Sequence, residues 1–103
     1  MSQLGQPYTS GRWVVKEGKE EAFIQEWTAF TEWSRTAAKG AESFFLIQDR
    51  TNGRHFLSFG GWTDPDAVQA WRSMPEMGER LGRCRALCDE FQAGDYVLSA
   101  LVG

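Results

Sequence analysis

The middle of the chain carries a hairpin signal that restricts the fold more than any other feature of the sequence. Two largely apolar segments, residues 43–50 and 54–62, flank the pair Asn52-Gly53, a strong short-range signal for an antiparallel hairpin. The first segment has Phe-Phe-Leu-Ile at its centre (residues 44–47), so apolar side chains point to both faces of the strand. A strand with one face in water would alternate apolar with polar residues. The sequence therefore predicts a sheet that is buried on both faces.

The segments before the hairpin read as a strand and a helix. Residues 8–15 end in an apolar run and predict the first strand, and residues 18–38 predict a long helix. One stripe of that helix is spaced to face a core. It consists of Phe23, Trp27, Phe30 and Ser34. Near the end of the hairpin, Gly60-Gly61 predicts a bulge or a close approach of the backbone to another group.

The last third of the chain reads as two helical segments and a strand. Thr63 or Asp64 can cap a short helix that has Pro65 in its first turn. A second helical segment is predicted over residues 75–91, and a final strand over residues 96–102 after a turn at Gly94.

This order of elements predicts one α+β domain with a ferredoxin-like βαββαβ fold, in which a four-stranded antiparallel sheet carries helices on one face. We expect residues 1–7 to be a flexible N-terminal tail and residues 8–103 to be the domain. The second apolar face of the sheet needs a cover, and another copy of the chain is the simplest one. A homodimer is therefore predicted.

Composition argues against several classes of function. The net charge is −3, and there is no basic stripe for binding nucleic acid. No apolar run approaches the length of a membrane span, so we expect a cytoplasmic protein with no membrane partner. Cys84 and Cys88 are expected to be reduced thiols on one face of the last helix. With a single histidine, no metal site is predicted.

Three stretches resemble the antibiotic biosynthesis monooxygenase domain family. They are residues 16–23 after the first strand, the Phe-Leu-Ser-Phe segment at 56–59, and the run Trp-Thr-Asp-Pro-Asp-Ala-Val-Gln-Ala-Trp at 62–71. The resemblance implies a dimeric α+β barrel whose pocket lies between the sheet and the helices of each subunit. It also implies oxidation of a phenolic or quinol substrate by O₂ without metal or flavin, although other members break down haem or isomerise small metabolites.

Single positions of the resemblance bear on which of these reactions fits. Trp62 matches the Trp that such enzymes place at the end of the third strand. Where many members carry a His nine residues later, this chain has Trp71. The first-strand Asn of the haem-degrading members corresponds to Gly11 here. Haem binding or degradation is therefore the less favoured reaction.

Oxygenation without a cofactor requires a proton acceptor, a group that stabilises an oxyanion, and a dry pocket with aromatic walls. His55 is the only histidine and is the candidate base, or else an exposed residue at the strand end. Arg12 is the candidate for stabilising the anion, or else pairs with an acid at a dimer edge. Trp62 completes the predicted catalytic set.

Four aromatic residues are candidates for binding the substrate. Trp27 and Phe30 on the long helix either line a pocket or fill the core. Trp62 and Trp71 lie at the two ends of the segment that is expected to cover the pocket. Tyr96 either donates a hydrogen bond to the substrate or anchors the last strand.

The resemblance, together with the large number of aromatic side chains, implies a cofactor-independent monooxygenase that acts on a polycyclic phenol or quinol, with an aromatic small molecule as its partner and no bound cofactor. The alternative is a non-enzymatic dimer that binds a small ligand or assists a neighbouring enzyme.

Overall fold

A computed structural model describes residues 3–103 as a sheet covered on one side by helices. Its elements follow the order β1, α1, β2, β3, α2, α3, β4. The strands are β1 (Pro7–Val15), β2 (Ala41–Gln48), β3 (His55–Trp62) and β4 (Cys88–Val97). The helices are α1 (Glu20–Ala37), α2 (Pro65–Arg72) and α3 (Pro75–Arg85). Within residues 3–103, no helix is long and apolar enough to cross a membrane.

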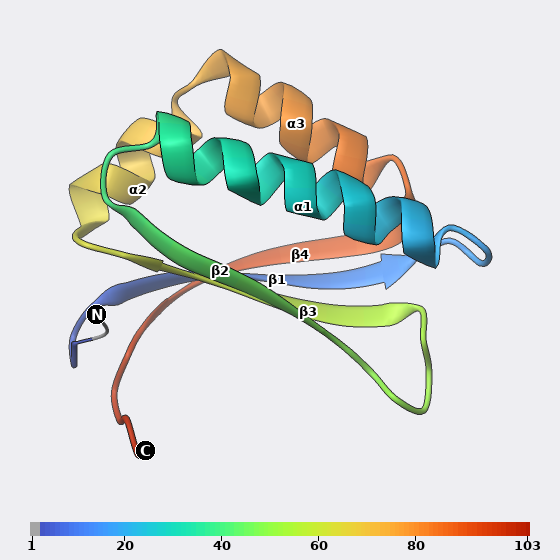
Figure 1. The fold of residues 1–103 in the computed structure, drawn as a ribbon, viewed down its shortest axis with the longest axis horizontal. Helices are drawn as coiled ribbons and strands as arrows, with labels where there is room; N and C mark the ends of the chain where they lie inside the picture. The colour runs from blue at the N-terminus through green and yellow to red at the C-terminus, as the bar shows by residue number, and fades with distance from the viewer. Residues whose placement is uncertain (1–2) are drawn as a thin grey trace.

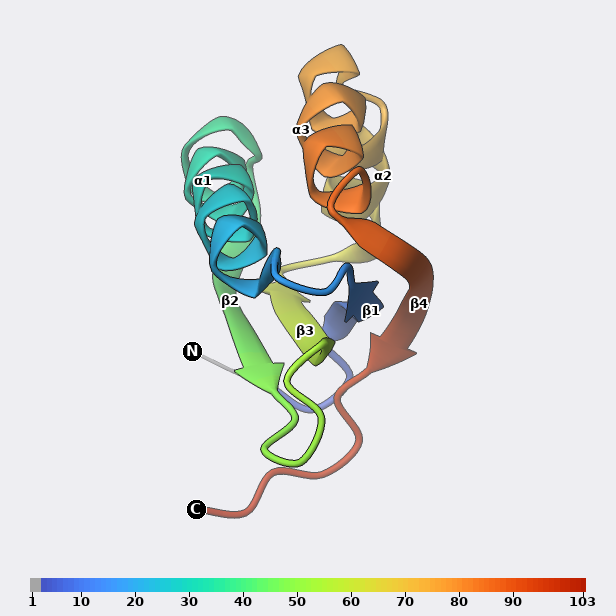
Figure 2. The same ribbon diagram turned by 90° about the vertical axis from the view of Figure 1, so that its right-hand side faces the viewer.

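The four strands form one antiparallel sheet in the order β2-β3-β1-β4, so β1 and β3 are its central strands. All three helices pack on the same face, and the opposite face is bare (Figures 1 and 2). The predicted ferredoxin-like fold is confirmed. The sheet is open and does not close on itself.

Residue parity along the central strands decides which side chains reach the helices. In β1, Thr9, Gly11 and Trp13 are buried beneath the helices, whereas Arg12 is exposed on the other face. In β3, the buried alternate positions begin at Phe56. The helix α1 meets this layer with its predicted stripe, whose members are all buried.

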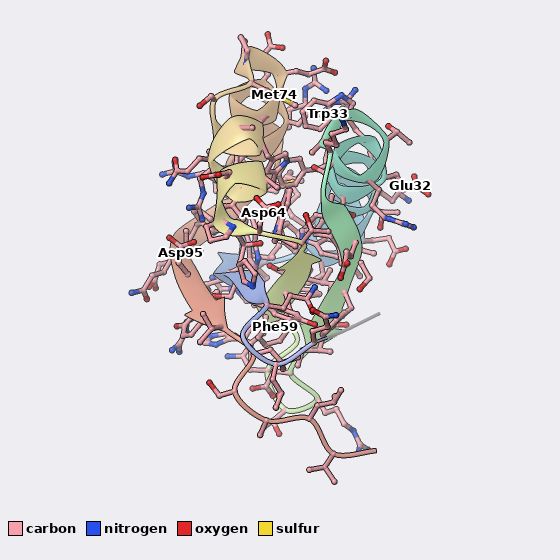
Figure 3. The ribbon with its side chains drawn as sticks, turned by 90° about the vertical axis from the view of Figure 1, so that its left-hand side faces the viewer. Glu32, Trp33, Phe59, Asp64, Met74 and Asp95 are labelled. Atoms are coloured by element: carbon pink, nitrogen blue, oxygen red, sulfur yellow. The ribbon has the colours of Figure 1, made fainter. Side chains whose placement is uncertain are left out.

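The bare face of the sheet is apolar at its centre, as the run at residues 44–47 predicted. Phe45 and Ile47 are 48% and 52% exposed, and they lie next to Leu57 and Phe59 of β3. Figure 3 shows Phe59 on the side of the sheet that points away from the helices. Both faces of this sheet are therefore apolar, but only one is covered within the chain.

The end of the chain differs from the prediction. The last helix stops at Arg85, and β4 begins at Cys88 rather than at residue 96. Helical spacing of apolar residues over 84–91 is overridden because β4 pairs with the whole of β1, from Val15 opposite Cys88 to Pro7 opposite Val97. The predicted turn at Gly94 is wrong for the same reason.

The central hairpin is confirmed, but its loop is longer than an Asn-Gly turn. The backbone φ of Asn52 and Gly53 is not positive, so the two-residue turn that favours this pair is not formed. Instead, the Asp49 carboxylate accepts hydrogen bonds from the backbone N–H groups of Asn52 and Thr51. These bonds lower the pKa of Asp49.

The segment before β1 packs against the segment after β4. The backbone N–H of Gly5 donates to Leu98, the N–H of Leu98 donates to Gln6, and the Gln6 side chain is buried. Residues 1 and 2 lie outside the described residues, and the predicted boundary at residue 8 stays a prediction.

Candidate functional site

A pocket of about 260 Å³ lies between the sheet and the helices. We call it the sheet–helix pocket. Its floor comes from β1 and β3, and its walls come from α1, α2, α3, β2 and β4. The lining consists of Thr9, Ser10, Gly11, Trp13, Trp27, Phe44, Ser58, Phe59, Gly60, Trp71, Arg72, Met77, Leu81, Phe91 and Ala93. The volume falls a little below the roughly 300–1,000 Å³ of pockets for drug-sized ligands, which suits a molecule of two or three fused rings.

Four small residues on the two central strands form the floor. Gly11 of β1 lies opposite Ser58 of β3, and Thr9 lies opposite Gly60. A Cβ atom on Gly11 would lie 2.6 Å from the Trp13 Nε1 and 2.7 Å from the Ser58 Oγ. The two glycines and two small hydroxyl residues therefore create the space above the centre of the sheet.

Gly60 opens the other half of the floor. A Cβ atom at this position would lie 2.6 Å from the ring of Phe44 and 3.1 Å from the Thr9 Oγ1. The close approach predicted for Gly60-Gly61 is thus confirmed at Gly60. The Phe44 ring fills the space that a larger residue would need.

Aromatic rings stand on both sides of the pocket. On one side, Trp13 packs against Phe91, the outer wall, with 4.2 Å between the ring centroids and 35° between the ring planes. On the other side, the ring centroid of Trp71 lies 4.8 Å from that of Trp62 and 6.5 Å from that of Phe44. Flat apolar walls on two sides are suited to a planar ring system.

Two indole N–H groups reach the hydroxyls of the floor. The Trp13 Nε1–H donates to the Ser58 Oγ at 3.0 Å, and the Trp62 Nε1–H donates to the Thr9 Oγ1 at 3.1 Å. All four residues are buried. These bonds hold each hydroxyl in place at the bottom of the pocket.

A charged pair lies at the rim. The Arg72 guanidinium makes two hydrogen bonds to the Asp95 carboxylate, at 2.5 and 3.1 Å, and so ties α2 to β4. The hydrogen bond from Arg72 lowers the pKa of Asp95. Figure 3 shows Asp95 at the outer edge of the sheet, beside α2. Among the described residues that line the pocket, Arg72 alone carries an ionisable side chain.

Comparison with known proteins places this architecture in a family. The sequence profile described as antibiotic biosynthesis monooxygenase matches residues 10–80, more than half of the chain. The chain belongs to the antibiotic biosynthesis monooxygenase family. A search of curated proteins finds no match.

Solved structures share the fold of this family member at low sequence identity. SnoaB, a cofactor-independent oxygenase from Streptomyces nogalater, superposes with a TM-score of 0.85 at 17% identity, over 95% of this chain and 97% of SnoaB. A conserved protein from Methanosarcina mazei gives 0.79 at 15% identity, over 91% and 93% of the two chains. Protein SO0527 from Shewanella oneidensis gives 0.77 at 19% identity, over 91% of each chain. At these identities the likeness shows the fold.

The pocket of this family member includes part of the residue set predicted from sequence. Trp27 and Trp71 line it. Phe30 is buried behind Trp71, with 5.8 Å between the ring centroids, and Trp62 is fully buried and reaches the pocket through its bond to Thr9. The structure thus gathers these four residues around one end of the pocket, and their predicted roles stay predictions.

The other three predicted residues lie elsewhere. Arg12 and His55 are exposed and line a groove of about 980 Å³ at the hairpin end of the sheet. Tyr96 is 60% exposed and forms part of a third surface depression. The groove around Arg12 is larger than the sheet–helix pocket, and in the single chain its walls carry exposed charged side chains such as Glu90. The structure does not bring these three residues to the sheet–helix pocket.

Sequence reasoning missed Thr9, Ser58 and the role of Gly11 as the floor. A signal was present, because Ser58 has the same parity as the apolar residue Phe56 and Thr9 the same parity as Trp13. A hydroxyl at a core-facing strand position needs a hydrogen-bond partner. That requirement points to the tryptophans.

The two cysteines are separated from the pocket chemistry. Cys84 lies on α3, but Cys88 is the first residue of β4, so the prediction of one shared helix face is wrong. Both thiols are free, and burial raises the pKa of Cys84 to about 12 and that of Cys88 to about 11. Neither thiol is ionised at neutral pH. Among residues 3–103, no group of three or more His, Cys, Asp or Glu side chains could hold a metal ion.

Proposed function

We propose that this protein is a cofactor-independent monooxygenase that oxidises a polycyclic phenol or quinol with O₂ in the sheet–helix pocket. Family membership supports the reaction class. The observation that carries the proposal is the pocket itself, in which indole and phenyl rings surround two fixed hydroxyls. SnoaB, which shares the fold, is a cofactor-independent oxygenase.

The proposed reaction needs only the substrate, O₂ and water. The bound substrate loses a proton to water or hydroxide at the rim and becomes a phenolate or the corresponding carbanion. One electron passes from this anion to O₂, and the resulting radical and superoxide combine into a carbon-bound peroxide anion, which takes back a proton from water. Loss of water from the peroxide leaves a new carbonyl, so that a ring CH₂ and O₂ give C=O and H₂O.

The protein contributes to this sequence by binding and by charge stabilisation. Trp13 and Phe91 on one side and Trp71 on the other hold a ring plane and exclude water. Hydrogen-bond donors on the floor stabilise the anion that reacts with O₂. Arg72 at the rim adds a positive charge that favours an anionic ligand, although its pair with Asp95 offsets part of that charge.

O₂ consumption by metal-stripped protein tests the proposal. With anthrone or a naphthohydroquinone as substrate, we expect uptake above the buffer rate. Two variants locate the reaction: Leu81→Trp fills the pocket from α3 and is expected to abolish the excess rate, whereas His55→Ala on the far face is expected to leave it within about twofold. Buffer-level uptake across the panel would refute the proposal, and loss of activity in His55→Ala alone would move the reaction to the other groove.

We also propose that a second copy of the chain covers the bare face of the sheet. Phe45, Ile47 and Leu57 form an exposed apolar centre, and exposed Arg12 and Glu90 lie on the neighbouring strands β1 and β4. In a two-fold dimer the same patch of both subunits would meet, and charged residues of opposite sign would lie at the edge of the interface. Sedimentation equilibrium at micromolar concentration is expected to give twice the chain mass.

A binding protein without catalysis is the second candidate function. It is favoured by one observation: within the described lining of the pocket, Arg72 is the only ionisable side chain, and it is already paired. Such a protein would bind fused-ring ligands in the same pocket. Tight binding with no O₂ consumption would establish this candidate.

A further inference from the structure

One indole–hydroxyl pair in the core has its full set of hydrogen bonds. The Ser34 Oγ accepts a hydrogen bond from the Trp71 Nε1–H at 3.0 Å and donates its own proton to the Phe30 carbonyl at 2.8 Å. Its donor and its acceptor partner both belong to the protein. This is the usual arrangement for a buried hydroxyl.

The two hydroxyls on the pocket floor lack the second half of this arrangement. The Ser58 and Thr9 oxygens each accept an indole N–H, but within residues 3–103 neither hydroxyl donates its proton to a protein acceptor. Both side chains are 8% exposed, and both line the pocket. Two buried hydroxyls that line the pocket thus each retain a proton that no acceptor among residues 3–103 takes up.

We propose that Thr9 and Ser58 are the ligand's hydrogen-bond donors, each binding a different oxygen of one fused-ring molecule. This inference rests on the proposed function for the reaction that follows, but it concerns binding alone. A hydroxyl that accepts an indole N–H is polarised and becomes a stronger donor. The tryptophans Trp13 and Trp62 therefore act as positioning residues behind the two donors.

The register of the strands separates the two donors. Thr9 lies opposite Gly60, and Ser58 lies opposite Gly11, so Thr9 and Ser58 are diagonal neighbours. Diagonal neighbours on antiparallel strands are about 7–8 Å apart at their Cα atoms. Two donors on diagonal positions match two oxygens on different rings of a naphthalene-sized molecule. The expected ligand is thus a fused aromatic compound that carries two oxygens on separate rings.

Ligand comparison on the unaltered protein is the first part of the test. Calorimetry under argon would compare 2,6-dihydroxynaphthalene, which has one oxygen on each ring, with 2-naphthol, which has one oxygen. Each hydrogen bond of ordinary strength changes affinity about 2- to 10-fold. We expect the diol to bind tighter by that factor. Equal affinity for the two compounds would overturn the inference without any variant.

Variants assign the effect to the two hydroxyls. Ser58→Ala and Thr9→Val are each expected to weaken diol binding by about 2- to 10-fold, whereas Thr9→Ser keeps the hydroxyl and is expected to keep the affinity. The matched control is Ser34→Ala, which also leaves an indole N–H without its acceptor but removes no free donor. An equal loss of affinity in Ser34→Ala would contradict the proposal, as would full affinity in folded Ser58→Ala and Thr9→Val proteins.

Binding and turnover separate this inference from the proposed function. If the protein binds the diol more tightly than 2-naphthol but consumes no O₂, the proposed monooxygenase activity is refuted and the proposed role of the two hydroxyls is retained. If Ser58→Ala and Thr9→Val change neither O₂ consumption nor the affinity for the diol, the proposed role of the two hydroxyls is refuted and the monooxygenase proposal is retained.

Discussion

Replacing Gly11 by Ala probes the floor of the pocket through a single methyl group. The new Cβ would lie 2.6 Å from the Trp13 Nε1, 2.7 Å from the Ser58 Oγ and 3.0 Å from the Trp13 Cε2. Neither neighbour can yield easily, because Trp13 is 3% exposed and β1 is paired with strands on both sides. The methyl group therefore enters the Trp13–Ser58 hydrogen bond itself.

Two costs and one gain set the size of the effect. Overpacking a tight core costs about 1–3 kcal/mol, and a buried donor that loses its acceptor costs about 1–3 kcal/mol. The lower entropy of an unfolded chain with Ala returns about 0.4–1 kcal/mol. We expect a net loss of about 2–4 kcal/mol in the free energy of unfolding. For a chain of this length, that corresponds to a fall in Tm of roughly 10–25 °C.

Urea unfolding followed by Trp fluorescence, with scanning calorimetry at one fixed protein concentration, measures this loss. Gly78→Ala is the matched control, because Gly78 is exposed within α3 and no atom lies within 4 Å of an added Cβ. In that helix, Ala is expected to stabilise the protein by about 0.5–1 kcal/mol. If Gly11→Ala changed stability by less than about 0.5 kcal/mol, the packing of the floor described above would be refuted.

Three further predictions follow from buried, paired and exposed groups. The pKa of Cys84 is raised from 9.0 to about 12 in the folded protein, so the thiol of the unfolded chain ionises first as pH rises. The free energy of unfolding should therefore fall between about pH 9 and about pH 12. Cys84→Ala should make this fall shallower when it is measured by urea titration at several pH values. The hydrogen bond from Arg72 lowers the pKa of Asp95 in the folded protein below its ordinary value of 3.8. The stabilisation by this pair is therefore present above pH 3.8 and is lost as pH falls through the pKa of the folded state. Asp95→Asn should remove that loss of stability in acid. Phe45→Lys should convert the proposed dimer into a monomer in sedimentation equilibrium, whereas Glu21→Lys on the exposed side of α1 should not.

Much of the fold could be predicted from the spacing of apolar residues, because in most segments the long-range contacts agree with the local preference for helix or strand. The stripe of α1 and the apolar run of β2 are set by local spacing, and both lie where the spacing predicted. The last strand could not be predicted in this way, because the apolar residues over 84–91 have the spacing of a helix rather than that of a strand. Pairing with the full length of β1 decides between the two, and that pairing is a property of the folded sheet.

The candidate site was predicted less well, for a physical reason. A search for bases and cations selects ionisable side chains such as Arg12 and His55, which water stabilises on the outer face. Strand parity alone separates Arg12 from the pocket, since its neighbour Trp13 is a large apolar residue that must face the core. The floor consists instead of glycines and neutral hydroxyls, whose importance depends on the tryptophans that reach them from other parts of the chain.

A crystal structure with bound 2,6-dihydroxynaphthalene tests the central claim most directly. We predict that the ring system lies between Phe91 and Trp71, with one oxygen within hydrogen-bond distance of the Ser58 Oγ and the other within hydrogen-bond distance of the Thr9 Oγ1. A ligand found instead beside Arg12 and His55 on the outer face, with the sheet–helix pocket unchanged, would contradict the account.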